Sequence, residues 1–230
     1  MRGPAEPGAQ GGPWESASLV IPAHNEAANI GPVVVAACEV LSRLASRYEV
    51  ILVDDGSSDG TSEVAWAAMS PEGVFRVLHH EKKSGYGLSV GEGLTAATGE
   101  VVAFLDGDGQ FDVGELPRLA ARLQEADLVA GVRARRADPW FRDLISGVFN
   151  VLVRILYGVR MKDVDCGMKI MRRRVLEAAS PLQAKSALLN TELFYKTSRS
   201  GLRAVQVHVS HLPRTAGTRS GARLRPILRA

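Results

Sequence analysis

Short apolar runs that alternate with segments of helical periodicity are the feature that most constrains the fold of this 230-residue chain. The strand-like runs occupy 18–21, 48–53, 74–79, 101–105 and 127–132. Helical periodicity predicts helices at 25–44, 62–69, 89–97 and 116–124. Continuous apolar runs are typical of strands that are buried on both faces of a parallel sheet. The alternation therefore predicts an α/β fold with a mostly parallel, doubly wound central sheet and helices on both faces.

The chain is long enough for one large domain, which we expect to cover residues 16–217. Residues 1–15 are rich in Gly and Pro and lack the apolar centre of a signal peptide, so they are predicted to form a disordered tail. Residues 218–230 are predicted to form a basic tail. Between residue 132 and that tail, the pattern predicts an arginine-rich loop, an apolar helix at about 140–157, a turn at 163–167 and further helices.

Cysteine usage and hydropathy favour a cytoplasmic protein. Cys38 and Cys166 show neither a disulfide framework nor a metal-binding spacing, which suits a reducing compartment. No apolar run is expected to span a bilayer, because the longest, at 144–159, is interrupted by Asn150 and Arg154.

The net charge of +3 conceals a strong asymmetry between the two halves of the chain. Residues 1–115 carry 6 Lys and Arg against 17 Asp and Glu, a net of −11, and residues 116–230 carry 22 against 8, a net of +14. An acidic half suits metal ions, whereas a basic half suits phosphates or an anionic membrane surface. Nucleic acid is not expected as a partner, since no aromatic-rich platform or DNA-reading motif accompanies the basic half.

The strand-like run at 101–105 ends in Asp106-Gly-Asp108-Gly-Gln110. In open α/β sheets, ligands bind outside the carboxyl ends of the strands. Two aspartates at i and i+2 can present oxygens to one hard cation, and the glycines allow the backbone to turn tightly around it. The pattern favours Mg²⁺ or Mn²⁺ carrying a diphosphate, although Asp-Gly is also common in turns that bind nothing.

Two further strand ends carry matching polar groups. Pro22-Ala-His-Asn25-Glu26 follows the first strand, and Asp54-Asp55-Gly-Ser follows the second. Because the carboxyl ends of parallel strands meet at one edge of a sheet, all three turns should face the same rim. Their convergence predicts a binding site rather than three unrelated surface loops.

Together these motifs, Pro-x-x-Asn-Glu, Asp-Asp-Gly-Ser-x-Asp-Gly-Thr and Asp-x-Asp, resemble the nucleotide-sugar domain of family 2 glycosyltransferases over about residues 16–220. The resemblance implies a GT-A fold, a nucleotide-diphosphate sugar donor and a divalent cation. It implies that the cation would be held by Asp106, Asp108 and Gln110. The donor-binding residues that it implies are Pro22, Asn25, Glu26, Asp54, Asp55, Lys83 and Asp106.

Motifs in the second half resemble the polyprenyl-phosphate sugar synthases, the branch of dolichyl-phosphate mannose synthases and dolichyl-phosphate glucosyltransferases. These motifs are Gly131-Val-Arg133, Trp140-Phe-Arg142-x3-Ser146-x3-Asn150, Asp163-x2-Cys166-Gly167-x-Lys169 and His211-Leu-Pro-Arg214. The resemblance implies a dolichyl- or undecaprenyl-type phosphate as acceptor and GDP-mannose or UDP-glucose as donor. The mannose branch usually has Asp-x-x-Ser-Gly-Phe-Arg, whereas Cys-Gly-x-Lys is nearer the glucose branch, so the sugar stays open.

The residue types also suit a lipid-phosphate acceptor. Arg142 and Ser146 lie one helical turn apart, and with Arg133 and Arg214 they could bind a phosphate through charge-assisted contacts. The apolar helix at about 140–157 suits either an ordinary core position or contact with a membrane or polyprenyl tail. Arginines at 172–174 and in the C-terminal tail could add attraction to anionic lipid. We therefore expect a peripheral enzyme at the cytoplasmic face of a membrane, an arrangement compatible with a separate membrane-anchoring subunit.

A phosphate acceptor needs no general base, because a phosphate monoester is largely dianionic near neutral pH. The expected reaction is a single in-line displacement that inverts the anomeric configuration. Its expected catalytic residues are Asp106, Asp108, Arg133, Arg142 and Ser146.

Two other functions are compatible with the sequence. A hydroxyl acceptor on a glycan or small molecule would require a carboxylate base, for which Asp163, Asp165 and Glu192 are the candidates. A non-catalytic nucleotide-sugar-binding module would retain the donor motifs without turnover.

Overall fold

The computed structural model describes residues 12–69, 73–133, 140–214 and 216, with the side chains of 140–146 and 148 outside the description. Within these residues seven strands form one sheet in the order β3-β2-β1-β4-β6-β5-β7. The strands are β1 (Trp14–Ala23), β2 (Ala45–Asp54), β3 (Val74–His79), β4 (Val101–Leu105), β5 (Leu128–Arg133), β6 (Met168–Arg172) and β7 (Ala204–Val209). All are parallel except β6, which pairs antiparallel with β4 and β5.

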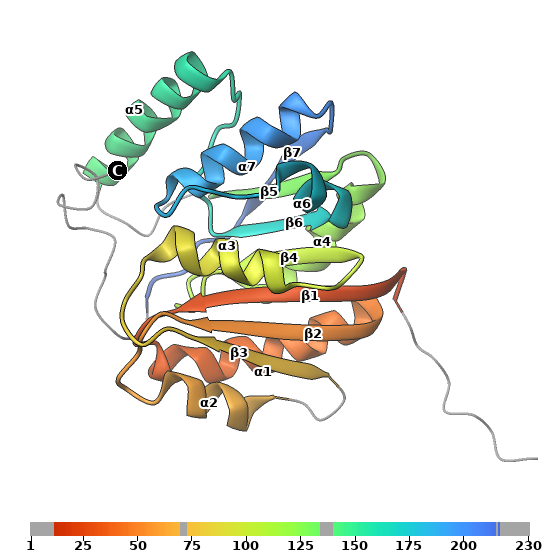
Figure 1. Ribbon diagram of the computed structural model, residues 1–230, viewed down its shortest axis with the longest axis vertical. Helices are drawn as coiled ribbons and strands as arrows, with labels where there is room; N and C mark the ends of the chain where they lie inside the picture. The colour runs from red at the N-terminus through yellow and green to blue at the C-terminus, as the bar shows by residue number, and fades with distance from the viewer. Residues whose placement is uncertain (1–11, 70–72, 134–139, 215, 217–230) are drawn as a thin grey trace, which may run out of the picture.

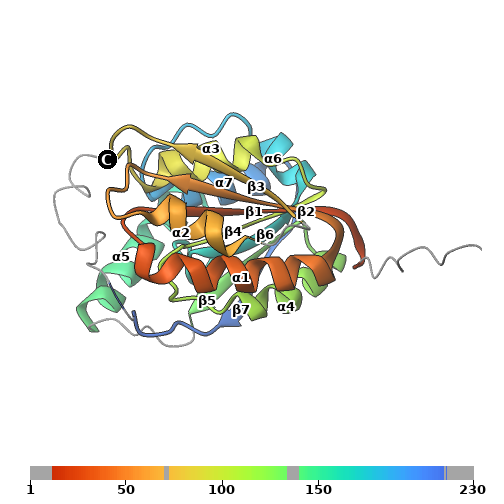
Figure 2. The same cartoon turned by 90° about the horizontal axis from the view of Figure 1, so that it is seen from below.

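Helices cover both faces of the sheet (Figures 1 and 2). The described helices are α1 (Ala27–Leu44), α2 (Thr61–Ala68), α3 (Tyr86–Ala96), α4 (Leu116–Ala121), α5 (Trp140–Tyr157), α6 (Arg173–Ala179) and α7 (Leu188–Arg199), with 3-10 turns η1 (Val113–Glu115) and η2 (Arg122–Gln124). The first face carries α1, α2 and α4, and the opposite face carries α3, α6 and α7. Helix α5 stands at one end of the molecule (Figure 1).

Each face of the sheet has its own apolar core, which explains why the central strands are apolar at nearly every position. Leu19 and Ile21 of β1 belong to the core beneath α1 and α4. Val20, between them, belongs to the core beneath α3 and α7. The prediction of a mostly parallel, doubly wound α/β sheet is therefore confirmed.

The second half of the sheet differs from the prediction, because the expected run of helices after the turn at 163–167 also contains two strands, β6 and β7. β6 has only five residues, Met-Lys-Ile-Met-Arg, and its buried Lys169 interrupts the apolar run. β7 is an edge strand of alternating apolar and polar residues, Ala-Val-Gln-Val-His-Val. That period-two alternation is a strand signal in its own right, distinct from the continuous apolar runs of the central strands.

Local predictions near the N-terminus also need correction. β1 begins at Trp14, so the last two residues of the predicted tail belong to the sheet. α2 begins at Thr61, one residue before the predicted helix at 62–69, and Gly60 precedes it with φ of 87°. The Thr61 hydroxyl accepts the Glu26 N–H and donates to Asp59 Oδ1, which links two loops.

The arginines at 172–174 have structural partners, and their attraction to anionic lipid stays a prediction. Arg172 donates to the Leu123 carbonyl, Arg173 to the carbonyls of Ala97 and Gly99, and Arg174 to the Asp127 carboxylate. The arginines of the C-terminal tail, 219–229, lie outside the described residues.

Among the described helices, α1 is the one that is long and apolar enough to cross a membrane, contrary to the expectation that no segment would be. Half of this helix is buried against the rest of the fold. Its buried positions, such as Ile30, Val34 and Leu41, belong to the core beneath the sheet. This packing is that of a core helix.

Candidate active site at the strand ends

The polar turns predicted from the sequence do converge at one edge of the sheet. β1, β2 and β4 are parallel and end there, and the antiparallel β6 begins there, which brings the 163–167 turn to the same edge. Two backbone hydrogen bonds join the turns: Gly107 N–H donates to Pro22 O (3.2 Å), and Asp106 N–H donates to Gly167 O (3.1 Å). Pro22 thus serves the site through its carbonyl.

Asn25 joins the first two turns. Its φ of 57° is in the left-handed region, which Asn tolerates better than most residues. Its N–H donates to Ser57 Oγ, and its side-chain oxygen accepts the Ser58 N–H, both at 2.9 Å. Asn25 therefore fixes the relative position of the loops that follow β1 and β2.

Asp54 and Asp55 have different roles, which the sequence could not separate. Asp54 accepts hydrogen bonds from the Ser57 N–H and the Ser62 hydroxyl. Burial alone would raise the pKa of Asp54, but these hydrogen bonds outweigh it and lower the pKa. Asp54 is thus committed to its own turn. Asp55 instead reaches the loop before α3.

In that loop Asp55 accepts the N–H groups of Ser84 (2.6 Å) and Gly85 (3.0 Å). It also contacts His80 Nδ1 at 2.8 Å, while His80 Nε2 lies 2.7 Å from Glu92. Burial alone would lower the pKa of His80, but the two carboxylates outweigh this effect and raise the pKa. His80 is not among the site residues predicted from the sequence, and its contacts make it a support for Asp55.

Lys83 lies in the same loop, exposed to solvent. Its backbone passes so close to Gly56, whose φ is 71°, that a Cβ at position 56 would lie 2.8 Å from Lys83 N. This close approach holds Lys83 beside the Asp54–Asp55 turn, as the donor-site prediction requires.

Asp106 and Asp108 present the acidic centre of the rim. Asp106 Oδ1 is buried and has no hydrogen-bond partner among the described residues, and the same holds for the Tyr86 hydroxyl. Burial and the charge of Asp108 raise the pKa of Asp106 to about 7, although nearby Tyr86 and Lys169 oppose the shift. A carboxylate oxygen that lacks a partner at this position suits a cation ligand.

Gln110 completes a set of oxygens that fits a hard cation. Its Nε2 donates to Leu212 O (3.0 Å). This hydrogen bond uses the amide nitrogen, and the amide oxygen is an acceptor that could bind a cation. The described residues contain no group of three or more His, Cys, Asp or Glu side chains arranged to hold a metal. Two carboxylates and one amide oxygen therefore suit Mg²⁺ or Mn²⁺ only if phosphate oxygens and water supply the other ligands.

Arg214 lies between two of these acidic groups. Its guanidinium pairs with Glu26, and Nη1 lies 3.5 Å from Asp108 Oδ2. Glu26 also accepts from Asn29 (2.8 Å), and burial raises the pKa of Glu26 against these contacts. The described contacts thus group Arg214 with the donor-side residues and not with Arg133, its predicted partner at the acceptor phosphate.

Arg133 forms a two-pronged ion pair with Asp163 of the 163–167 turn. Nε lies 2.8 Å from Oδ2 and Nη2 lies 2.7 Å from Oδ1. The side chains are only 11% and 6% exposed. Burial alone would lower the pKa of Arg133, but Asp163 outweighs this effect and raises the pKa. The guanidinium is therefore a permanent cation at the rim.

The other two candidate bases differ in position. Asp165 keeps one buried oxygen, Oδ1, without a partner among the described residues, and burial followed by the charge of Asp163 raises the pKa of Asp165. Glu192, on α7, accepts the N–H groups of Gln183 and Ala184 and pairs with Lys196 (2.7 Å). The structure gives Glu192 a local role and does not bring it to the rim.

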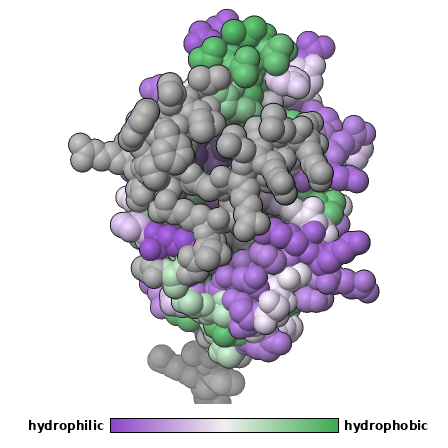
Figure 3. Space-filling model, turned by 90° about the vertical axis from the view of Figure 1, so that its left-hand side faces the viewer, coloured by the Kyte–Doolittle hydropathy of each residue, from purple (hydrophilic) through white to green (hydrophobic). Residues whose placement is uncertain are grey.

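Helix α5 carries Arg142 and Ser146, whose side chains lie outside the description, so their predicted role at the acceptor phosphate stays a prediction. The second half of α5 exposes apolar side chains, and Figure 3 shows this hydrophobic patch at one end of the molecule. The exposed large side chains of this half are Val151, Leu152, Ile155, Leu156 and Tyr157.

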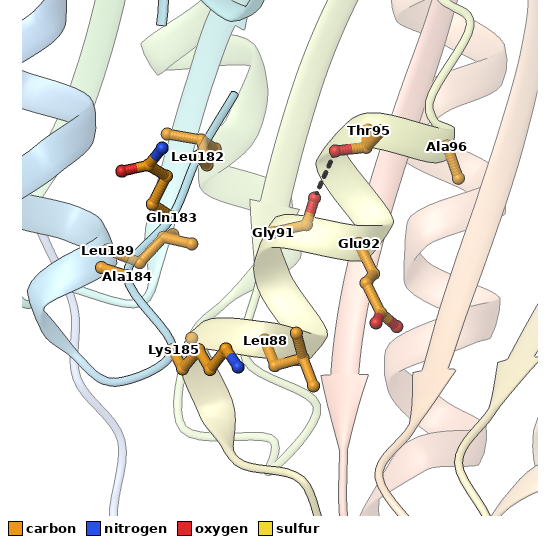
Figure 4. A pocket seen from close by; sticks show the side chains of 11 residues that line it. Leu88, Gly91, Glu92, Thr95, Ala96, Leu182, Gln183, Ala184, Lys185 and Leu189 are labelled. Carbon is orange, nitrogen blue, oxygen red and sulfur yellow. Dashed lines mark hydrogen bonds between the residues drawn. The ribbon is translucent and has the colours of Figure 1, made fainter. Parts of the chain in front are cut away.

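A separate open groove lies between α3 and residues 182–189 (Figure 4). Glu92 and Lys185 line it from opposite sides, and Thr95 donates to the Gly91 carbonyl within its wall. None of the site residues predicted from the sequence lines this groove.

Known proteins resemble both the sequence and the fold. An undecaprenyl-phosphate 4-deoxy-4-formamido-L-arabinose transferase of Aeromonas hydrophila is 34% identical over 87% of this chain and 61% of its own length. Its counterpart from Serratia proteamaculans is 33% identical over 77% of this chain and 55% of its own length. The chain therefore spans less than two thirds of these relatives.

Among solved structures, a glucosyl-3-phosphoglycerate synthase from Mycobacterium tuberculosis, in complex with Mn²⁺, UDP and glucosyl-3-phosphoglycerate, superposes with a TM-score of 0.68. It is 22% identical and covers 89% of this chain and 73% of its own, which establishes a shared fold. The family model described as "Glycosyl transferase family 2" matches residues 18–179, well over half of the chain. The chain belongs to the family 2 glycosyltransferases.

Proposed function

We propose that this chain transfers a sugar from a nucleotide diphosphate to a polyprenyl phosphate, with inversion at the anomeric carbon. One arrangement supports this proposal most directly. The acidic pair Asp106–Asp108 shares its rim with two cations, Arg214 on one side and Arg133 beside the 163–167 turn. This arrangement suits a reaction between two phosphate-bearing substrates, because arginines and a cation held by the acidic pair could neutralise phosphate charge. The undecaprenyl-phosphate transferases at 34% and 33% identity support the same acceptor class.

At the donor end, the joined loops after β1 and β2 would bind the nucleoside, and the Asp106–Asp108–Gln110 turn would face the diphosphate. Asp55 orders the loop that carries Lys83 through two backbone hydrogen bonds. Arg214, held by Glu26 and close to Asp108, is positioned to neutralise phosphate oxygens. We therefore reassign Arg214 from the acceptor phosphate to the donor diphosphate.

A divalent cation held by Asp106, Asp108 and Gln110 would act as a Lewis acid on the diphosphate leaving group. The acidic pair would otherwise repel that group, because two carboxylates and the negatively charged diphosphate would meet at one rim.

At the acceptor end, Arg133 would orient the lipid phosphate. Its contact with Asp163 uses Nε and one Nη2 hydrogen, and the guanidinium has further N–H donors on its other edge. A phosphate oxygen would attack C1 of the sugar while the bond from C1 to the diphosphate breaks. Arg142 and Ser146 of α5 would complete the phosphate site.

The exposed apolar half of α5 would lie against the membrane or the polyprenyl tail. Ile155 and Leu156 are 72% and 70% exposed, and the exposed Arg154 lies in the last turn of the same helix. An apolar helix face with nearby cations suits an anionic bilayer surface. We propose peripheral attachment at the cytoplasmic face.

A second candidate function, transfer to a hydroxyl, is favoured by one observation. Asp165 combines a buried oxygen that has no described partner with a raised pKa, which are properties of a general base. Asp163 is less suited to this role, because Arg133 occupies both of its carboxylate oxygens.

Incubation with labelled GDP-mannose, UDP-glucose and related donors, Mn²⁺ and either undecaprenyl phosphate or hydroxyl acceptors separates the two functions. Label in the organic phase supports the proposal. Label on a hydroxyl acceptor alone, abolished by Asp165→Asn, would replace it with the second function. Binding of the donors, detected as a rise in melting temperature, without turnover on any acceptor would indicate a binding module.

A further inference from the structure

Lys169 is completely buried, with 0% of its surface exposed. Among the described residues, no other lysine or arginine is completely buried. It lies on β6, opposite Phe104 of β4, and its ammonium group lies over the rings of Phe104 and Phe194 at 4.9 and 5.6 Å. Burying a cation is costly unless specific contacts compensate it. Such a residue is expected to have a role that an apolar side chain cannot fill.

The ammonium group donates to two different elements, the 163–167 turn and α7. Nζ lies 2.6 Å from the carbonyl of Cys166 in the 163–167 turn and 2.9 Å from Oδ1 of Asn190 on α7. The two aromatic rings are themselves fixed in β4 and α7. The single ammonium group of Lys169 therefore links the 163–167 turn to β4 and to α7.

The turn that Lys169 holds contacts Asp106 directly. Gly167, the residue after Cys166, accepts the Asp106 N–H. The Asp106 carboxylate packs so closely on Gly167 that a Cβ there would lie 1.9 Å from Oδ2. A displacement of the Cys166–Gly167 peptide would therefore displace the acidic group at the metal site.

The same turn also carries Asp163, which orients Arg133 through the two-pronged ion pair. Cys166 lies three residues after Asp163 on the same short turn. We propose that Lys169 is a positioning residue that sets Asp106 on the donor side and Arg133 on the acceptor side through this single turn. The assignment of those two sides rests on the proposed function, whereas the geometry of the turn does not.

The test compares Lys169→Met with a matched control, Lys196→Met. Methionine preserves much of the length of the side chain and removes its charge and donors. Lys196 is a partly exposed lysine on α7 that pairs with Glu192. A second variant, Asn190→Ala, removes one acceptor of the Lys169 ammonium group and keeps the lysine, in case Lys169→Met does not fold.

Hydrogen exchange in the protein without substrate gives the first measurement. We expect amide exchange in peptides covering 105–110 and 163–168 to rise about tenfold or more in Lys169→Met, and less in Asn190→Ala, because a charged hydrogen bond is lost. Peptides covering 54–60, held by their own hydrogen bonds, should stay within about twofold of wild type. Lys196→Met should leave all three unchanged.

The second measurement is a titration with Mn²⁺ alone, monitored by electron paramagnetic resonance. We expect the dissociation constant for Mn²⁺ to rise about tenfold in Lys169→Met, as when a partner of a metal ligand is lost, and to be unchanged in Lys196→Met. An even rise of exchange over the whole chain, or unchanged exchange at 105–110 and 163–168, would overturn the positioning role. Neither result depends on the acceptor, so failure of the proposed function would be seen separately, as absent transfer by the wild-type protein.

Discussion

Replacement of Asp163 by Asn should leave a buried guanidinium without its counter-charge. The Arg133–Asp163 pair has two contacts of 2.7 and 2.8 Å and side chains that are 11% and 6% exposed. Removing one partner of such a buried pair typically costs about 3–5 kcal/mol. For a chain of this size, 1 kcal/mol corresponds to about 2–4 °C in melting temperature, so we expect a decrease of about 10 °C.

A double variant tests whether the pair matters for stability or for the reaction. Replacing both partners by apolar residues, Arg133→Met with Asp163→Leu, removes the unpaired charge and should restore much of the lost stability. Transfer to polyprenyl phosphate should stay absent, because the cation that orients the acceptor phosphate is gone. The account therefore predicts that melting temperature and turnover respond differently in the same protein.

Differential scanning calorimetry and a phase-partition transfer assay on the two single variants and the double variant provide the data. A melting temperature of Asp163→Asn equal to that of wild type would refute the buried-pair reasoning. Full turnover by the double variant would refute the role of Arg133 at the acceptor.

Four further predictions concern the rim and α5. Asp108→Asn should reduce metal-dependent turnover by about a thousandfold, since several kcal/mol of charge stabilisation is lost, with an unchanged circular dichroism spectrum as the control. The raised pKa of Asp106, about 7, means that the metal-free fold retains the associated stability below the unfolded value of 3.8 and loses it as pH rises through about 7. Mn²⁺ affinity should accordingly weaken about tenfold per pH unit below 7 and level off above it, whereas a flat profile from pH 5 to 8 in a calorimetric titration would contradict the shift. Gly167→Ala should abolish turnover because its Cβ would overlap the Asp106 carboxylate, while Gly31→Ala in α1, whose Cβ would lie 3.4 Å from the Val64 side chain of α2, should keep activity in the same assay. Ile155→Glu, at a position 72% exposed, should reduce sedimentation with anionic liposomes several-fold and leave transfer to a short, soluble polyprenyl phosphate unchanged; equal sedimentation would exclude this face as the membrane contact.

The first half of the site could be predicted from the sequence because its signals are local. Asn25, Asp54 and Asp106 each lie within two residues of the end of an apolar strand, so each signal is local in the sequence. Parallel strands then bring these ends together by a general rule. The short runs at 74–79 and 101–105 even match the boundaries of β3 and β4.

The second half depends on contacts between distant segments, which no local pattern encodes. The insertion of β6 between β4 and β5 places Lys169 in the core and the 163–167 turn at the rim. Arg214 follows β7 and reaches Glu26, 188 residues earlier in the chain. Its basic character predicts a phosphate-binding residue, but only the fold shows that Glu26 and Asp108 are the acidic groups it faces.

The central claim, transfer to a phosphate, is tested most directly by the chemical form of the product. Nuclear magnetic resonance of purified product from labelled donor, Mn²⁺ and undecaprenyl phosphate should show a phosphodiester phosphorus coupled to the anomeric proton of the sugar. The anomeric configuration should be inverted relative to the donor. A lipid phosphate that stays a monoester while the sugar is attached to a hydroxyl, or retention of configuration, would contradict the account.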